Sequence, residues 1–176
     1  MKKLTIDQCD MVYKQVGTPC FLINEEMFVD NIQHIKSAFL NEYNRTIVSY
    51  SFKTNYVPYI CKLAKNYGFK AEVVSYLEYQ IAKRVGFAAE DIIMNSPIKR
   101  YDEFETAILD GALVNIDSFY ELSHLAKIRE TNPSKPVQVG IRVNIPIVDE
   151  NGVSAIYGEE KIGRFGFVDS ELDEVI

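Results

Sequence analysis

Short runs of β-branched and other apolar residues alternate along this chain with longer segments of helical periodicity, and this alternation constrains the fold more than any other feature. The runs predicted as strands are Thr46–Tyr50, Phe69–Val74, Ile92–Met94, Leu113–Ile116 and Val137–Val143. Their starts lie roughly 22 residues apart, which leaves room for a crossover helix between parallel strands. The pattern therefore predicts an α/β fold with a parallel sheet covered by helices.

Two architectures satisfy this pattern: an open, doubly wound sheet and a closed (β/α)8 TIM barrel. A full barrel typically needs about 250 residues. The chain has 176 residues and stops in what reads as another helix, so we expect only the N-terminal part of a barrel, cut short. The exposed strand edges of such a fragment would favour self-association.

Local signals refine the expected elements. Thr18–Asn24 reads as a strand and Glu25–Leu40 as a helix. Ser118 and Glu121 are spaced as a capping box ahead of a helix at Phe119–Arg129. The expected left-handed residues at helix ends are Gly68, Gly86 and Gly111.

Composition excludes several classes of protein. The chain is 47% hydrophobic and 25% charged, which is typical of a folded soluble protein. Its net charge of −6, without a long basic run, argues against a nucleic-acid partner. We find neither an apolar stretch of the ~20 residues needed for a membrane span nor a signal peptide, and so expect a cytoplasmic protein with no membrane partner.

The cysteines and histidines do not indicate a metal centre. Cys9, Cys20 and Cys61 form no C-x-x-C pair, so we expect reduced thiols, no zinc site and no other metal. His34 and His124 lie in helix-like segments among polar residues, where histidines on a helix surface are common.

Lys53 is the residue best placed for chemistry. It directly follows the strand-like run that ends at Phe52, and the carboxyl ends of barrel strands form the active-site face. A lysine in a partly dry setting can form a Schiff base with an aldehyde cofactor that acts as an electron sink. The alternative is a solvated lysine at a strand end, which is the commoner situation for this residue type.

The residues around Lys53 resemble a known enzyme family. YSFKTN at Tyr50–Asn55 is similar to the YAxKAN motif of the alanine-racemase-like enzymes that use pyridoxal phosphate (PLP), among them the diaminopimelate, ornithine and arginine decarboxylases. Further similar segments follow in the family's order: GTPCFLIN at Gly17–Asn24, AEVVSYLE at Ala71–Glu78, NSPIK at Asn95–Lys99, IDSFYEL at Ile116–Leu122, GIRVN at Gly140–Asn144 and KIGRFG at Lys161–Gly166.

The resemblance implies a fold, a cofactor and roles for particular residues. It implies that residues 25–176 are the N-terminal part of a PLP-binding barrel and that residues 1–24 add a strand to a small β domain. Lys53 would be the Schiff-base residue, with Glu72 and Arg142 also at the cofactor. A buried arginine needs a carboxylate partner, and Glu72 is the expected one, either in the cofactor site or as a plain structural ion pair.

Two more positions and several departures bear on the activity. Glu78 and Lys99 match family positions, although each could equally be a solvated helix residue. Glu72 replaces an aspartate of the family motif and Arg164 replaces a lysine, which leaves the substrate open. The resemblance also places a stacking histidine, a phosphate loop and a C-terminal β domain beyond residue 176, so we expect this chain alone to be inactive.

The expected activity is decarboxylation of a basic or dicarboxylic amino acid by a homodimer, with diaminopimelate as the first choice of substrate. NSPIK at Asn95–Lys99 also favours an ornithine, arginine or carboxynorspermidine type of decarboxylase. An amino-acid racemase on the same barrel and a non-catalytic PLP-binding barrel stay open as alternatives.

Overall fold

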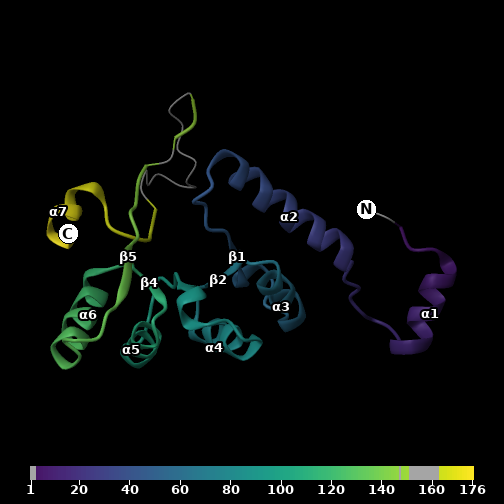
Figure 1. The fold of residues 1–176 in the computed structure, drawn as a ribbon, viewed down its shortest axis with the longest axis horizontal. Helices are drawn as coiled ribbons and strands as arrows, with labels where there is room; N and C mark the ends of the chain where they lie inside the picture. Colours follow the sequence, from purple (N-terminus) through teal and green to yellow (C-terminus); the bar gives the residue numbers. More distant parts are fainter. Residues whose placement is uncertain (1–2, 147, 151–162) are drawn as a thin grey trace.

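A five-stranded parallel sheet with helices along one face forms the centre of the computed structural model, which describes residues 3–146, 148–150 and 163–176 (Figure 1). The strands are β1 (Ser49–Ser51), β2 (Lys70–Val73), β3 (Ile92–Met94), β4 (Leu113–Ile116) and β5 (Gln138–Ile141). The helices are α1 (Ile6–Val16), α2 (Glu25–Glu42), α3 (Pro58–Asn66), α4 (Tyr76–Val85), α5 (Tyr101–Asp110), α6 (Phe119–Thr131) and α7 (Leu172–Val175). Short 3₁₀ turns are η1 (Phe52–Thr54), η2 (Ala89–Asp91) and η3 (Asp169–Glu171).

The strand order separates the two architectures that the sequence left open. Each strand pairs in parallel with the next one in the sequence, giving the order β1-β2-β3-β4-β5. A doubly wound sheet reverses its order at a switch point and carries helices on both faces. Here α3, α4, α5 and α6 all lie on the same face of the sheet (Figure 1). The chain thus forms the N-terminal part of a (β/α)8 barrel, as predicted.

The predicted strands agree with the observed ones in type and order. Ile92–Met94 and Leu113–Ile116 are confirmed residue for residue, whereas the other three predicted runs begin before the observed strands. Those leading residues lie outside the paired registers between neighbouring strands, and a strand is defined by such pairing.

The core lies between the sheet and its helices because alternate strand residues point to opposite faces. Ala71 and Val73 of β2 and Ile92 and Met94 of β3 are fully buried against the helices. Residues between them, such as Glu72, lie on the opposite face and are only half-buried. The candidate chemistry therefore gathers on the face that does not carry α3–α6.

Local signals fix the helix ends. Gly86 and Gly111 end α4 and α5 with φ of 100° and 101°, left-handed values that favour glycine, as expected. The Asn24 side chain accepts a hydrogen bond from the Met27 N–H at 2.9 Å and caps α2, which confirms the predicted helix. One face of α2 packs through Ile32 in a small cluster with Ala64 and Phe69.

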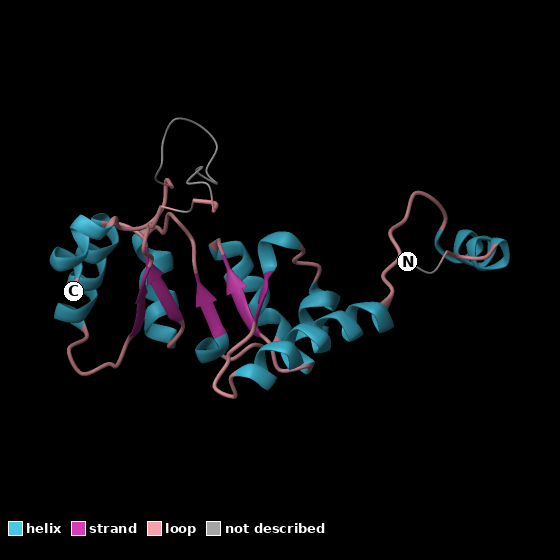
Figure 2. Cartoon of the chain, turned by 90° about the horizontal axis from the view of Figure 1, so that it is seen from above, coloured by secondary structure: helices cyan, strands magenta, loops and turns pink. Residues whose placement is uncertain are grey.

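The N-terminal segment differs from the prediction. Residues Ile6–Val16 form α1, which has no buried residue and lies away from the sheet (Figure 2). Thr18–Asn24, predicted as a strand, has no strand in the structure, and Phe21 there is fully exposed. The prediction failed because a strand needs a hydrogen-bonded partner, and none of the described strands pairs with this segment. The division into a β-domain segment at 1–24 and a barrel at 25–176 stays a prediction.

Among the described residues, no helix has both the length and the apolar character needed to cross a bilayer.

Candidate functional site

Lys53 lies at the carboxyl end of β1, in the turn η1. The neighbouring Phe52 is completely buried, and its ring packs edge-on against Tyr50 and Phe87. The Thr54 hydroxyl donates to the Ser51 carbonyl at 2.8 Å and closes the turn. Anchored on both sides, the turn leaves Lys53 exposed. In the described part of the chain no carboxylate pairs with its ammonium group.

A row of hydrogen bonds crosses the open face of the sheet beside this turn. The Ser51 hydroxyl donates to one oxygen of Glu72, and the Asn95 amide donates to the other at 3.2 Å. The Asn115 amide in turn donates to the Asn95 side-chain oxygen at 3.1 Å. On β5 this row meets Gly140, where a Cβ would lie 2.3 Å from the Asn115 side-chain oxygen. Side-chain hydrogen bonds therefore connect the first four strands, or the residues that directly follow them, with the carboxylate of Glu72 in the row.

The structure contradicts the predicted ion pair between Glu72 and Arg142. Arg142 follows β5, and its Nη1 donates to the Asp117 carboxylate at 3.0 Å. Its guanidinium carbon also lies 4.7 Å from the centre of the Phe165 ring. Strands in a sheet are spaced by about 4.8 Å, so Glu72 on β2 is roughly 14 Å from β5. Arg142 does have a carboxylate partner, as expected for an arginine in this position. That partner is Asp117, which follows β4, the strand next to β5.

The two possible carboxylate partners of Arg142 can be distinguished by their energetic coupling to it. In a double-mutant cycle, Asp117→Ala and Arg142→Ala should show coupling of about 0.5–3 kcal/mol, as contacting residues do. The cycle of Glu72→Ala with Arg142→Ala should be additive within about 0.5 kcal/mol. Denaturant unfolding of the five variants measures both. Coupling confined to the Glu72 cycle would show that the arginine has the partner first expected.

A second lysine near the strand ends is buried and fully bonded. Lys99 Nζ donates to both oxygens of Glu121, at 2.9 and 2.8 Å, and to the Ser96 carbonyl at 2.7 Å. The two charged side chains are 0% and 1% exposed. Burial lowers the pKa of Lys99, and the bond to Glu121 opposes that shift. The interpretation of Lys99 as a solvated helix residue is therefore wrong.

Glu121 and Glu78 close the same kind of strand-to-helix turn. Each is the third residue of its helix, and each carboxylate accepts the backbone N–H four residues earlier, from Asp117 and Val74 respectively, at 2.9 Å. Glu78 is buried, so it is not a solvated helix residue. Ser118 makes no side-chain cap bond, and Glu121 accepts the N–H of Asp117 rather than that of the cap residue Ser118, so the expected capping box is not formed.

The two histidines and Cys61 differ in their burial. His34 is exposed, whereas His124 is buried among the rings of Tyr101, Phe104 and Tyr120. The interpretation of His124 as a residue on a helix surface is wrong, because this side of α6 packs on α5. Cys61 is buried, and its burial raises the pKa of the thiol to about 11, so this sulfur is a poor nucleophile at neutral pH.

The C-terminal motif is only partly described, because Lys161 and Ile162 lie outside the described residues. Asn144 and Gly163 exchange two hydrogen bonds, and Phe167 N–H donates to the Arg142 carbonyl at 2.8 Å. The segment after residue 162 is thereby held beside the end of β5, next to Arg142.

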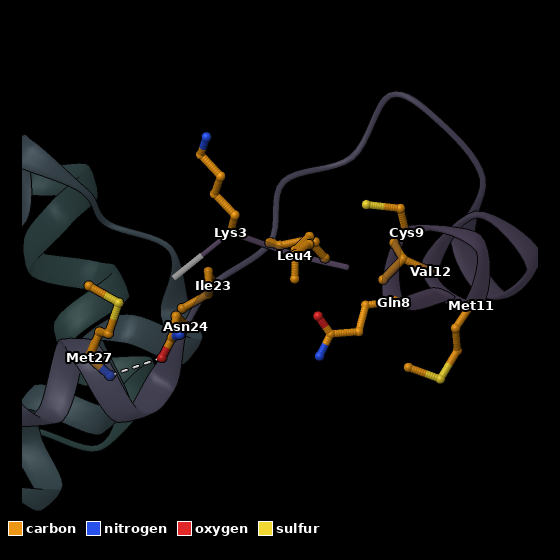
Figure 3. Close-up of a pocket in the computed structure, with 10 residues that line it drawn as sticks. Lys3, Leu4, Gln8, Cys9, Met11, Val12, Ile23, Asn24 and Met27 are labelled. Atoms are coloured by element: carbon orange, nitrogen blue, oxygen red, sulfur yellow. Dashed lines mark hydrogen bonds between the residues drawn. The ribbon is translucent and has the colours of Figure 1, made fainter. Parts of the chain in front are cut away.

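A separate open groove of about 780 Å³ lies between α1 and the start of α2 (Figure 3). Apolar side chains such as Leu4, Met11, Val12 and Met27 line much of it. It contains none of the residues predicted for chemistry, and we assign the candidate site to the strand ends.

Comparison with known proteins supports a family assignment. Residues 29–175 match the family described as "Pyridoxal-dependent decarboxylase, pyridoxal binding domain". A diaminopimelate decarboxylase of Archaeoglobus fulgidus is 29% identical over 155 residues, which cover 88% of this chain and 36% of that protein. An L-glutamyl-[BtrI acyl-carrier protein] decarboxylase of Niallia circulans is 30% identical over 178 residues, which cover 98% of this chain and 40% of that protein.

Solved structures agree with the fold. The diaminopimelate decarboxylase of M. jannaschii in co-complex with L-lysine is 25% identical, with a TM-score of 0.78 over 93% of this chain and 38% of that one. The chain thus spans well under half the length of the relatives it matches. The match covers β1–β5 together with Lys53, Glu72 and Arg142, and it identifies PLP as the cofactor of this domain. The chain belongs to the pyridoxal-dependent decarboxylase family and carries most of its residues in the pyridoxal-binding domain.

Proposed function

We propose that this chain is the N-terminal part of a PLP-dependent decarboxylase of a basic or dicarboxylic amino acid, with Lys53 as the residue that attaches the cofactor. The observation that carries the proposal is the state of the two lysines near the strand ends. Lys99 has three acceptors around its Nζ and no exposed surface, so it has no free position for an aldehyde. Lys53 is exposed and has no carboxylate partner among the described residues.

The side chains around Lys53 fit the needs of this cofactor. A primary amine at a strand end can bind the PLP aldehyde, and the bound cofactor supplies an electron sink for the pair left when carbon dioxide departs. Glu72, which accepts two hydrogen bonds, places a carboxylate on the neighbouring strand. The Arg142 side chain is 31% exposed and uses Nη1 on Asp117, so its other N–H groups can face an anionic group of cofactor or substrate.

Diaminopimelate is the first choice of substrate. Relatives named as diaminopimelate decarboxylases support this choice, although the Niallia circulans relative acts, by its name, on an L-glutamyl group held by a carrier protein. Decarboxylation of ornithine, arginine or carboxynorspermidine, racemisation, and cofactor binding without catalysis are the competing activities. We further propose a homodimer in the cytoplasm.

A substrate panel tests the proposal. The full-length protein, loaded with PLP, is incubated with diaminopimelate, ornithine, arginine, carboxynorspermidine and an L-glutamyl carrier protein, and released carbon dioxide is measured. We expect release from diaminopimelate at the highest kcat/KM. Loss of optical activity without carbon dioxide would establish a racemase instead. PLP binding without turnover of any of the five would contradict the decarboxylase proposal.

A further inference from the structure

A chain of contacts connects the buried Lys99–Glu121 pair with Arg142 in the candidate site. One oxygen of Glu121 accepts both the Lys99 ammonium, at 2.8 Å, and the Asp117 backbone N–H, at 2.9 Å. The Asp117 side chain, which is 8% exposed, then accepts the Arg142 guanidinium at 3.0 Å. Because Lys99 also binds the Ser96 carbonyl, the contacts tie together the segments that follow β3, β4 and β5.

The turn after β2 shows that the buried lysine is not needed to close such a turn. There Glu78 accepts the Val74 N–H at 2.9 Å in the same geometry. Within the described residues Glu78 has no lysine partner. A carboxylate at this position in the first turn is already favoured by the helix dipole. The feature that closes the turn after β4 is therefore the acceptor oxygen of Glu121, and its ion pair with Lys99 offsets the desolvation penalty of burying that carboxylate.

We infer that Glu121, through the oxygen that accepts the Asp117 N–H, is a positioning residue for the Asp117–Arg142 pair. The Asp117 N–H donates to one oxygen of Glu121, at 2.9 Å. That contact sets the backbone at Asp117, and the backbone sets the direction of the carboxylate that orients Arg142. Glu121 and Lys99 are themselves buried, and the contact that links Glu121 to the candidate site runs through Asp117.

The consequence for cofactor binding rests on the proposed function, in which Arg142 faces the cofactor or substrate. If Asp117 no longer fixes Arg142, the guanidinium can still bind an anion. Binding must then also immobilise the arginine side chain, which weakens the affinity. We expect the dissociation constant of PLP to rise by about tenfold to a hundredfold, as metal affinity does when a residue that orients a metal ligand is removed.

Two matched double variants of the full-length protein test the inference. Lys99→Met with Glu121→Gln removes both charges but keeps an oxygen for the Asp117 N–H. Lys99→Met with Glu121→Met removes the charges and the oxygen, with a side chain of similar size. We expect the glutamine variant to keep Arg142 on Asp117 in a crystal structure and to keep the PLP affinity of the parent. The methionine variant should lose both.

Equal PLP affinity of the two variants, or Arg142 still on Asp117 in the methionine variant, would overturn the inference. If the methionine variant does not fold, Glu121→Asp takes its place, because it keeps the charge and withdraws the carboxylate by one methylene. It should release the Asp117 N–H and displace Arg142, and an unmoved Arg142 again overturns the inference. Failure of the parent protein to bind PLP would refute the proposed function, whereas the crystal structures still decide the positioning role.

Discussion

Replacing Lys53 by alanine should abolish the attachment of PLP and the visible absorption that goes with it, and reduce turnover to background. The reason is chemical: alanine has no amine, and the other lysine near the strand ends is saturated by Ser96 and Glu121. Absorbance spectra of the full-length variant with added PLP, together with carbon dioxide release, measure both effects. The loss should not be accompanied by unfolding, because Lys53 is exposed and Phe52 anchors its turn.

Lys62→Ala is the matched control for this experiment. Lys62 is an exposed lysine on α3, the helix that follows Lys53 in the chain, and it is not part of the row of polar residues on the open face. We expect its spectrum and turnover to equal those of the parent. A Lys53→Ala protein that keeps its visible band would show that another amine carries the cofactor.

The second large effect concerns stability. Lys99→Met should lower the free energy of unfolding by about 3–5 kcal/mol, because it leaves the carboxylate of Glu121 buried without its counter-charge. Adding Glu121→Gln removes that charge and keeps the acceptor for the Asp117 N–H, so part of the loss should return. Denaturant unfolding of the full-length protein gives both values.

An exposed ion pair provides the comparison for this stability measurement. Lys83 and Asp110 are 3.5 Å apart, and their side chains are 41% and 42% exposed. Lys83→Met should therefore change stability by only about 0–1 kcal/mol. If Lys99→Met has as small an effect as Lys83→Met, or if the added Glu121→Gln makes the protein still less stable, the charges are not held in a dry site.

The fold was predictable because its signals are repeated and local. Each βα unit carries its own apolar strand, its own helical period and a turn residue such as Gly86 or Gly111, and these signals agree with one another. The strand proposed at Thr18–Asn24 failed for the opposite reason. Its local sequence suits a strand, but strand formation depends on a partner that no local pattern specifies.

The sequence predicted the location of site residues that lie in or next to a strand, but not which residues pair with one another. Lys53 directly follows β1, where the strand pattern placed it, and Glu72 lies in β2 on the neighbouring strand. The partner of Arg142 was not predictable, because it depends on strand order, which the spacing of β-branched runs leaves open. The burial of Lys99 was missed as well, since nothing in its local pattern indicates that it reaches Glu121 on another unit. The repeated glutamate in the third position after a serine was the available signal for the turns.

The lysine that holds the cofactor can be identified by chemical labelling. The full-length protein is incubated with PLP, reduced with borohydride so that an amine-bound cofactor becomes permanent, digested, and mapped by mass spectrometry. We predict a pyridoxyl group on the peptide that contains Lys53 and on no other at stoichiometric amounts. A stoichiometric label on a different lysine, or no label at all in a protein that binds PLP, would contradict the assignment of Lys53.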